Sequence, residues 1–444
     1  MSLRFGTDGV RGRVPDELSV DDVRRLGAAA ADVLGGDRFL VGRDTRESGP
    51  LLEQALLEGL AARGVRGVRL GVVPTPAVAW LAAADGVAAA VISASHNPFH
   101  DNGIKLFAPG GLKLDDRLQD DVQRELDREL PIEPPAGGVE AVEDPGAVAR
   151  YEAAVRASLD GRDLHGLHIV VDCANGAASA IAPETLRALG ARVDVLCASP
   201  DGRNINDGCG STHPARLQDE VRRVGADVGL AFDGDADRVL AVDADGELVD
   251  GDQIIAICAI DRKARGLLAG DTVVVTVMTN LGFRLAMRER GIEVVETGVG
   301  DRYVLEALEA HGLSLGGEQS GHIIFRDLAT TGDGLLTGVQ LLDVVRRSGR
   351  PLADLARDAM ERLPQVLHNV RIENRLPDIA ERLAPVIATI EASLGERGRV
   401  IVRPSGTEPV VRVMVEAGTR GEAEDAAAAL VAEVGRVARS AANT

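Results

Sequence analysis

The sequence predicts an α/β protein, with three similar mixed α/β domains and a C-terminal α+β domain arranged around one cleft. Three observations lead to this prediction. The chain has 444 residues, and single hydrophobic cores stop growing at about 250–300 residues. A strand–helix–strand pattern with a glycine after the helix occurs three times, as in parallel βαβ units. Residues 366–444 follow a different order of strands and helices, typical of a small α+β domain.

Each repeat opens with an apolar strand and a helix. The expected opening strands are 39–42, 168–172 and 272–277, and the expected helices are 51–63, 183–189 and 282–290. A further apolar strand completes each repeat and ends in a polar loop. Ligands of open α/β sheets bind at the carboxyl ends of strands, so three such loops predict one shared cleft. Ordinary βαβ repetition without a shared function is the alternative.

Domain boundaries are expected where composition changes. A segment rich in Pro, Gly and Glu at 128–148 separates the first repeat from the second. The predicted domains are 1–150, 151–252, 253–365 and 366–444. In the last of these the expected strands are 368–372, 400–402 and 410–416, and the expected helices are 377–395 and 422–438.

Composition excludes several classes of protein. The net charge of −20 argues against nucleic acid and anionic membranes as partners. No apolar run approaches about 18 residues, and the N-terminus lacks the apolar segment of a signal peptide. The 4 cysteines are widely spaced without a C-x-x-C pair, which favours reduced thiols. We therefore expect a cytoplasmic protein.

The segment from Asp233 to Arg238 carries aspartates at 233, 235 and 237 in a turn that contains a glycine. Carboxylate oxygens are ligands for hard cations such as Mg²⁺. An EF-hand is excluded, because position six of the loop is Arg238 and position twelve is Ala244. A solvated acidic turn is the alternative. Asp233, Asp235 and Asp237 repel one another unless a cation neutralises them, which favours a Mg²⁺ site.

The first repeat ends in a loop that is expected to carry Ser93, Ser95, His96, His100 and Lys105. A serine hydroxyl is a poor nucleophile without a metal or an adjacent base. Opposite the aspartates, Ser95 suits the transfer of a phosphoryl group. A simple Ser-His-Asn-Pro turn remains the alternative for this segment taken alone.

Two further loops offer groups that bind a phosphorylated sugar. Arg403, Ser405, Gly406 and Thr407 combine a guanidinium, two hydroxyls and an open backbone, which together favour phosphate binding over an ordinary loop. In the loop 316–322, Glu318 and Ser320 offer hydrogen bonds to vicinal sugar hydroxyls. His322, considered alone, is better explained as a structural histidine.

Together these segments resemble the α-D-phosphohexomutases. The likeness runs from the sequence at 5–12 to that at 403–409 and covers essentially the whole chain. The family resemblance implies a fourth domain like the TATA-binding protein and a phosphoserine at Ser95. It also implies one Mg²⁺ held by Asp233, Asp235, Asp237 and an oxygen of phospho-Ser95.

The resemblance assigns the remaining site residues as well. Glu318 and Ser320 would bind sugar hydroxyls, and Arg403, Ser405, Gly406 and Thr407 the phosphate that does not react. The residues expected near the reacting oxygens are Arg11, His96, Lys105, Arg238 and His322. Lys105 and His322 are the candidates for general acid and base.

The implied activity is interconversion of glucosamine 6-phosphate and glucosamine 1-phosphate through a bisphosphate, which feeds UDP-N-acetylglucosamine and cell-wall precursor synthesis. The Glu-Gln-Ser form of the sugar loop favours the amino sugar over glucose or mannose phosphates. A sugar bisphosphate activator and a possible homodimer follow from the resemblance only. The alternatives are a phosphomannomutase or phosphoglucomutase, a Mg²⁺-dependent phosphatase, and a non-catalytic protein that binds sugar phosphates.

Overall fold

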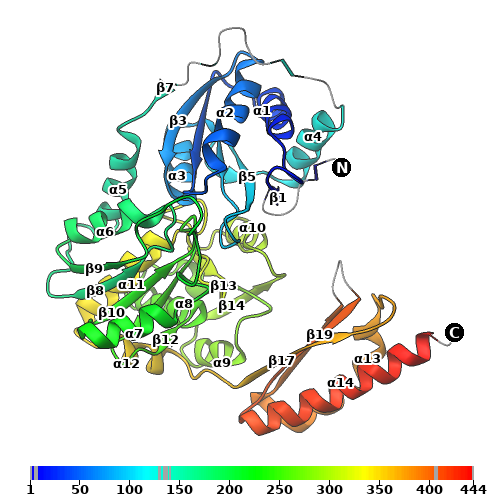
Figure 1. Ribbon diagram of the computed structural model, residues 1–444. Coiled ribbons are helices and arrows are strands. Elements are labelled where there is room, and N and C mark those ends of the chain that lie inside the picture. The colour runs from blue at the N-terminus through cyan, green and yellow to red at the C-terminus, as the bar shows by residue number, and fades with distance from the viewer. Residues whose placement is uncertain are drawn as a thin grey trace. The chain divides into compact units, whose positions relative to one another are not determined.

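The computed structural model describes residues 3–4, 9–128, 132–133, 139, 142–404 and 409–442. The chain forms two compact units. The first is made of Met1–Met278 and Ile292–Arg357, and the second of Thr279–Gly291 and Asp358–Thr444. Figure 1 shows three sheets in the first unit and one in the second.

The first sheet has seven strands in the order β1-β5-β4-β2-β3-β7, with β6 paired to β5. Strands β2, β3, β4 and β7 are parallel, and β5 is antiparallel to both of its main neighbours, β1 and β4. The strands are β1 (Val10–Arg13), β2 (Arg38–Arg43), β3 (Arg66–Val72), β4 (Ala88–Ile92), β5 (Asp101–Ala108), β6 (Leu112–Lys113) and β7 (Val142–Glu143).

The second and third sheets repeat the central part of the first. The second sheet has the order β12-β11-β10-β8-β9, and the third has the order β14-β13-β15-β16. Their strands are β8 (His168–Asp172), β9 (Arg192–Leu196), β10 (Val228–Phe232), β11 (Val239–Asp243), β12 (Leu248–Val249), β13 (Thr272–Thr276), β14 (Glu293–Thr297), β15 (Leu315–Gly317) and β16 (Ile323–Phe325).

Three parallel strands followed by one antiparallel strand therefore occur in the same order in each sheet: β3-β2-β4-β5, β9-β8-β10-β11 and β14-β13-β15-β16. This confirms the predicted threefold α/β arrangement. One detail of the prediction is wrong. Lys105 does not lie in the loop with Ser95, because the chain re-enters the sheet at Asp101 as β5 and Lys105 pairs with Val91 of β4.

Helices connect and cover the strands, and several begin at residues suited to capping. Ser19 and Asp22 form a capping box at α1, and Asp250 and Gln253 form another at α8. The helices are α1 (Val20–Leu34), α2 (Gly49–Ala61), α3 (Thr75–Asp85), α4 (Asp116–Leu126), α5 (Ala147–Ala157), α6 (Ala178–Ala188), α7 (Ala215–Val224), α8 (Gly251–Ala264), α9 (Leu281–Glu289), α10 (Asp301–His311), α11 (Gly334–Ser348), α12 (Leu352–Ala359), α13 (Ile379–Leu394) and α14 (Arg420–Ala442), with short 3-10 turns η1 (Ala269–Asp271) and η2 (Gly395–Arg397). Among the helices described, none has the length and apolar character that a membrane crossing demands.

The second unit has its own sheet and core. Its strands β17 (Gln365–Arg371), β19 (Val410–Glu416) and β18 (Arg399–Pro404) form an antiparallel sheet, and α13 and α14 pack against it (Figure 1). Aliphatic residues of the strands and helices fill the core between them, including Val413, Leu383 and Leu430. The predicted C-terminal α+β fold is confirmed, with the expected order of elements.

Candidate active site

Ser95 lies in the tight turn that follows the fully buried strand β4. Its side chain is 1% exposed, and its φ of 51° is in the left-handed region. A non-glycine residue in such a conformation costs on the order of 1–3 kcal/mol and persists where the surroundings hold it in place. The Ser95 amide donates to Ser93 Oγ at 2.9 Å, and the Ser93 hydroxyl donates to Asp44 Oδ2 at 2.7 Å. The Ser93 side chain therefore links the Ser95 backbone to Asp44 and stabilises the turn.

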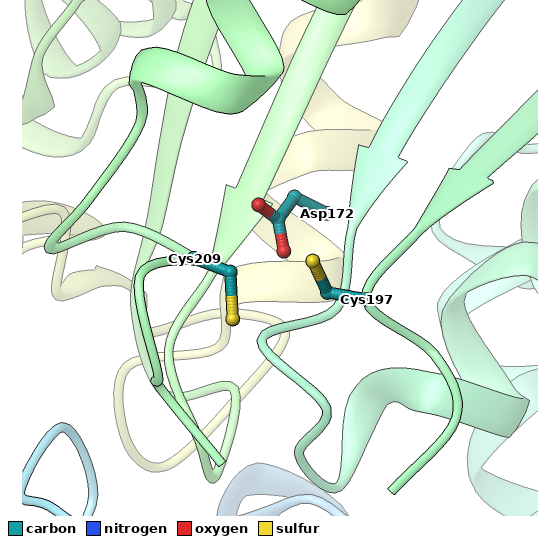
Figure 2. Close-up of side chains that lie close together, drawn as sticks. All are labelled: Asp172, Cys197 and Cys209. Atoms are coloured by element: carbon teal, nitrogen blue, oxygen red, sulfur yellow. The ribbon is translucent and has the colours of Figure 1, made fainter. Parts of the chain in front are cut away.

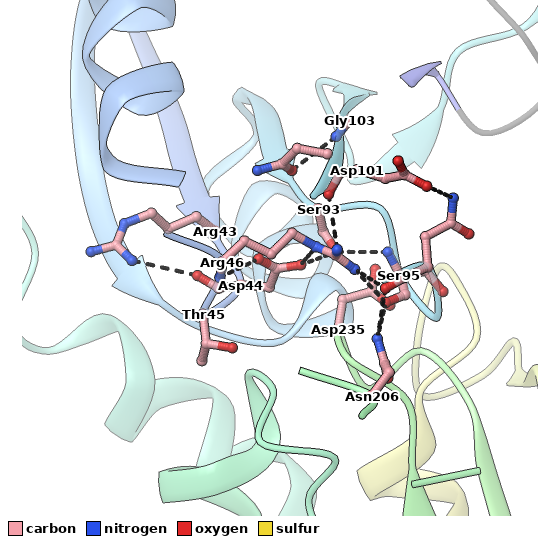
Figure 3. A network of polar contacts seen from close by, with 12 residues as sticks. Arg43, Asp44, Thr45, Arg46, Ser93, Ser95, Asp101, Gly103, Asn206 and Asp235 are labelled. Carbon is pink, nitrogen blue, oxygen red and sulfur yellow. Dashed lines mark hydrogen bonds and ion pairs between the residues drawn. The ribbon is translucent and has the colours of Figure 1, made fainter. Parts of the chain in front are cut away.

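Arg46 holds the rest of this turn together. Its side chain is 0% exposed and donates from Nε to Asp44 Oδ2 at 2.8 Å. Its terminal nitrogens donate to the carbonyl oxygens of Ser95, Asn97 and Asp101, each at 2.9 Å, and also to that of Pro98. Figure 3 shows this fan of contacts, with the Asn206 amide approaching the Ser95 carbonyl from the opposite side, at 2.9 Å. The serine is thus fixed by its backbone, which leaves the hydroxyl for chemistry.

Asp233, Asp235 and Asp237 follow strand β10 directly and are all buried. One carboxylate oxygen from each lies within 4.8 Å of the others. The Ser95 hydroxyl donates to Asp233 Oδ2 at 2.6 Å. Glycine is required at 234, because a Cβ there would lie 2.5 Å from the Ser95 carbonyl oxygen. The structure therefore brings the predicted serine and the three predicted aspartates together.

This aspartate cluster has the properties of a cation site. Asp235 Oδ1 and Asp237 Oδ1 are buried and accept no hydrogen bond from the described part of the chain. Burial and the charges of Asp237 and Asp235 raise the pKa of Asp233 well above its ordinary value. Orphaned oxygens and mutually repelling carboxylates fit a small divalent cation that takes oxygen ligands. Mg²⁺ matches this donor set.

Two donors from the first sheet and its helices contact the cluster. Lys105 Nζ lies 2.7 Å from Asp235 Oδ2 and 3.0 Å from Asp237 Oδ2, and its side chain is buried. The Thr75 hydroxyl donates to Asp235 Oδ2 at 2.6 Å. Burial opposes ionisation of Asp237, yet Lys105 and His322 hold its pKa well below the ordinary value. The cluster is therefore anionic but partly neutralised by Lys105.

His322 lies between two carboxylates. Its Nδ1 is 3.7 Å from Asp237 Oδ1 and its Nε2 is 3.4 Å from Asp301 Oδ2. Burial disfavours the charged ring, but Asp301 and Asp237 raise the pKa of His322 overall. The Gly332 amide donates to Nε2 at 3.1 Å, which requires a lone pair there. The neutral ring therefore carries its proton on Nδ1, facing the aspartate cluster.

His96 lies beside the serine and is influenced by two arginines. His96 Nδ1 is 3.3 Å from Ser95 Oγ. Burial lowers the pKa of His96, and the charges of Arg238 and Arg11 lower it further. The Arg238 amide donates to Asp233 Oδ1 at 3.2 Å. A neutral imidazole thus lies beside the serine hydroxyl, and two guanidinium charges lie close enough to act on that imidazole, which suits a phosphoryl group.

The predicted sugar-binding residues follow β15. Glu318 and Ser320 are both half-buried, and Glu318 Oε1 accepts the Gly300 amide at 3.0 Å. Ser320 Oγ is 3.5 Å from Glu318 Oε2, so both groups lie together. Arg403 is half-buried in β18 of the second unit. The sequence at 5–8 and Ser405, Gly406 and Thr407 lie outside the described residues.

Four family models match the chain, three described as alpha/beta/alpha domains I, II and III of phosphoglucomutase/phosphomannomutase and one as its C-terminal domain. They match residues 2–132, 149–246, 250–363 and 367–433. The phosphoglucosamine mutase of Frankia alni is 53% identical over 98% of each chain. That of Thermobifida fusca is 52% identical over 96% of each chain. The chain belongs to the phosphoglucomutase/phosphomannomutase family.

Solved structures of this family have the same fold. A phosphoglucomutase/phosphomannomutase family protein from Burkholderia thailandensis is 28% identical with a TM-score of 0.79, covering 99% of this chain and 97% of the other. An N-acetylphosphoglucosamine mutase from Aspergillus fumigatus, solved with GlcNAc-6P and magnesium, is 18% identical with a TM-score of 0.71, covering 99% and 96%. At that identity the second likeness concerns the fold alone.

Sequence reasoning missed several residues of this family member's site. Asp44 and Arg46 fix the serine turn, Thr75 contacts Asp235, and Asp301 contacts both His322 and Lys113. Asp44 and Arg46 follow strand β2 directly, so the rule about carboxyl ends of parallel strands could have indicated them. Thr75 and Asp301 begin helices, and no local signal distinguishes them from ordinary first-turn residues.

Proposed function

We propose that the protein is a phosphoglucosamine mutase, an isomerase that interconverts glucosamine 6-phosphate and glucosamine 1-phosphate. The substrate assignment is supported by the curated relatives of that name, which are 51–54% identical over nearly the full chain. The chemistry is supported by one contact above all, the Ser95 hydroxyl 2.6 Å from Asp233 in the aspartate cluster. A serine in that position suits the storage of a phosphoryl group between turnovers.

The proposed reaction has two transfers. The first breaks the bond between phosphorus and Ser95 Oγ and forms one to the 1-hydroxyl of glucosamine 6-phosphate. The hydroxyl proton passes to a base, Ser95 Oγ takes up a proton as it leaves phosphorus, and the product is a bisphosphate. After the bisphosphate turns over in the site, its 6-phosphoryl group returns to Ser95 Oγ, which gives up its proton to a base, and O6 takes a proton. Glucosamine 1-phosphate is released and phospho-Ser95 is restored.

The residues have separate roles in this proposal. His96, Arg11 and Arg238 surround the transferred group, and Glu318 and Ser320 hold sugar hydroxyls that superpose approximately in both orientations. Lys105 and His322 remain the candidates for moving protons. Lys105 Nζ can release a proton only when its contacts with Asp235 and Asp237 loosen. The neutral His322 ring has its proton on Nδ1, 3.7 Å from Asp237 Oδ1, so it would accept a further proton at Nε2 or give one up at Nδ1.

Mg²⁺ would be held by Asp233, Asp235, Asp237 and an oxygen of phospho-Ser95, where it would polarise the phosphoryl group as a Lewis acid. Arg403, Ser405, Gly406 and Thr407 would bind the phosphate that is not reacting. A sugar bisphosphate would restore Ser95 whenever the intermediate escapes. We further propose a cytoplasmic enzyme that feeds nucleotide-sugar synthesis; a homodimer and the bounds of the four domains stay predictions.

The test is a substrate competition with purified protein. Glucosamine, glucose and mannose 6-phosphates are offered together with Mg²⁺ and a catalytic amount of bisphosphate, and products are followed by phosphorus NMR. We expect glucosamine 1-phosphate to form first, without release of inorganic phosphate. Preference for glucose or mannose phosphate would make the protein a phosphoglucomutase or phosphomannomutase. Accumulation of inorganic phosphate would make it a phosphatase.

A second test concerns Ser95 itself. Intact mass and peptide mapping of the purified protein should reveal one phosphate at Ser95. S95A should lose both the phosphate and the mutase activity. S93A is the matched variant from the same loop, and it should remain phosphorylated, because the hydroxyl that donates to Asp233 is that of Ser95, whereas the Ser93 hydroxyl donates to Asp44. Phosphate on Ser93, or wild-type activity in S95A, would refute the phosphoserine mechanism.

A further inference from the structure

A second cluster of reactive side chains lies outside the active site. Cys197, Cys209 and Asp172 each offer an atom within 4.8 Å of the others. The two cysteines are 12 positions apart in sequence, on the loop that leaves β9. Figure 2 shows the Cys197 sulfur turned toward the Asp172 carboxylate, with the Cys209 side chain beside them. The proposed reaction of the sugar phosphate uses none of these three residues.

The two thiols differ in access and in charge environment. Cys197 is half-buried, whereas Cys209 is 1% exposed. Arg216 Nη1 donates to Cys197 Sγ at 3.4 Å. Hydrogen bonding from Cys209 lowers the pKa of Cys197, and the same contact with burial raises that of Cys209. A half-buried thiol that accepts a hydrogen bond from a guanidinium, with a second and buried thiol beside it, is the arrangement of a thiol that reacts first and a thiol that resolves it.

We propose that Cys197 and Cys209 are a redox modification site, which hydroperoxides convert to an intramolecular disulfide. The Cys197 thiol ionises and its sulfur attacks one peroxide oxygen, so that a sulfur–oxygen bond forms, the oxygen–oxygen bond breaks, and the leaving oxygen takes the thiol proton and departs as an alcohol or water. Cys209 then attacks the Cys197 sulfur. The sulfur–sulfur bond forms, and hydroxide leaves with the Cys209 proton as water. The dithiol loses two electrons and the peroxide gains them.

This site is connected to the serine turn through the same loop. Asn206, three positions before Cys209, donates from its side-chain amide to the carbonyls of Ser95 at 2.9 Å and Asn97 at 3.2 Å. Gly210, the next residue after Cys209, donates its amide to Asp172 Oδ2 at 3.0 Å. Drawing Cys209 toward Cys197 therefore displaces the segment that supports the Ser95 backbone. The disulfide loosens the serine turn.

The first experiment uses the full chain, with hydrogen peroxide as the oxidant and intact mass and peptide mapping as readouts. We expect wild-type protein to lose two hydrogens, to yield a Cys197–Cys209 cross-linked peptide and to recover with dithiothreitol. C258S is the matched control, because Cys258 is buried and burial raises its pKa to about 12. It should form the same cross-link. C209S should instead retain a sulfenic acid on Cys197, which dimedone traps.

Two outcomes overturn the modification site. One is oxidation that leaves Cys197 and Cys209 unlinked while other cysteines react. The other is zinc that copurifies with the wild-type protein and is absent from C209S, since the sulfurs would then be metal ligands. Hydrogen exchange of the peptide covering residues 93–103 tests the connection to the serine turn. Faster exchange in the disulfide form supports it, and unchanged exchange refutes it. None of these readouts depends on mutase activity.

Discussion

The Thr75 hydroxyl offers a sharp test of the metal site, because it touches an aspartate that would hold the metal without being a ligand itself. It donates to Asp235 Oδ2 at 2.6 Å from a side chain that is 1% exposed. The Thr75 amide also donates to the Asp235 carbonyl at 2.9 Å. T75V removes the hydroxyl and keeps the shape and the backbone contact. Its effect therefore reports on the orientation of the carboxylate.

The structure sets the size of the effect. A hydrogen bond to a charged group contributes about 1.5–3 kcal/mol, and loss of a partner behind a metal ligand costs about 10–100-fold in metal affinity. Asp235 Oδ2 retains Lys105 Nζ at 2.7 Å as a second donor. We therefore expect the lower end of this range in T75V. Mg²⁺ should bind about tenfold more weakly, equivalent to about 1.4 kcal/mol.

The assay is calorimetric titration of Mg²⁺ into T75V, supported by mutase rates at varied free Mg²⁺. T75S retains the hydroxyl and should bind Mg²⁺ as the wild type does. T185V is the control for replacing a buried threonine elsewhere, since Thr185 Oγ1 has no hydrogen-bond partner within the described ranges. Wild-type Mg²⁺ affinity in T75V, or equal weakening in T75V and T185V, would refute the reasoning.

Three further predictions follow from buried charges. K105M leaves the carboxylates of Asp235 and Asp237 buried without the Lys105 ammonium, which costs about 3–5 kcal/mol of folding stability. Mg²⁺ should therefore raise the melting temperature of K105M more than that of the wild type. Equal shifts in melting temperature would count against a cation site that the ammonium and Mg²⁺ share. R46M should lower both the melting temperature and the occupancy of phosphate on Ser95, as measured by mass spectrometry. R46K should be intermediate, because it restores the positive charge but not the full set of hydrogen bonds to the turn. Full phosphorylation of Ser95 in R46M would contradict this prediction. Burial raises the pKa of Asp333 to about 6, so the folded protein holds a proton that the unfolded chain releases near about 3.9. The folding stability of the wild type should therefore fall relative to that of D333N as pH rises from about 4 to 7. Melting temperatures of the two proteins that change in parallel with pH would exclude this prediction.

Local sequence patterns predicted the groups that form the centre of the candidate site. Ser95, Asp233, Asp235 and Asp237 follow apolar strands directly, and strand ends are where α/β sheets bind ligands. The structure brings these four side chains together as predicted. The threefold repeat of α/β units was also predictable, because alternation of strands, helices and glycines repeats along the chain, whereas the order of strands within each sheet was not predicted. These features depend on residues close in sequence.

The supporting contacts were not predictable in the same way, because they join distant positions. Thr75 and Asp235 are 160 residues apart, and Lys105 and Asp235 are 130 apart. Lys105 is predicted to lie in a loop because the apolar run of the preceding strand stops at two serines, a histidine, an asparagine and a proline. In the structure those residues turn only briefly, and β5 pairs with both β4 and β1. Pairing with two neighbours stabilises a strand that its own sequence does not indicate.

The contact between Ser95 and Asp233 couples the charge on the serine side chain to the charge of the aspartate cluster. In the unphosphorylated protein the hydroxyl donates a proton to the carboxylate at 2.6 Å. Phosphorylation removes that donor and adds about −1.5 to −2 charges beside three buried carboxylates. Two unit charges about 4 Å apart interact by about 4 kcal/mol at an effective dielectric of 20, and Lys105 and Arg238 offset only part of this repulsion. A phosphorylated Ser95 would therefore need a divalent cation in the same site, which fits an aspartate cluster built around a serine in a chain whose net charge is already −20.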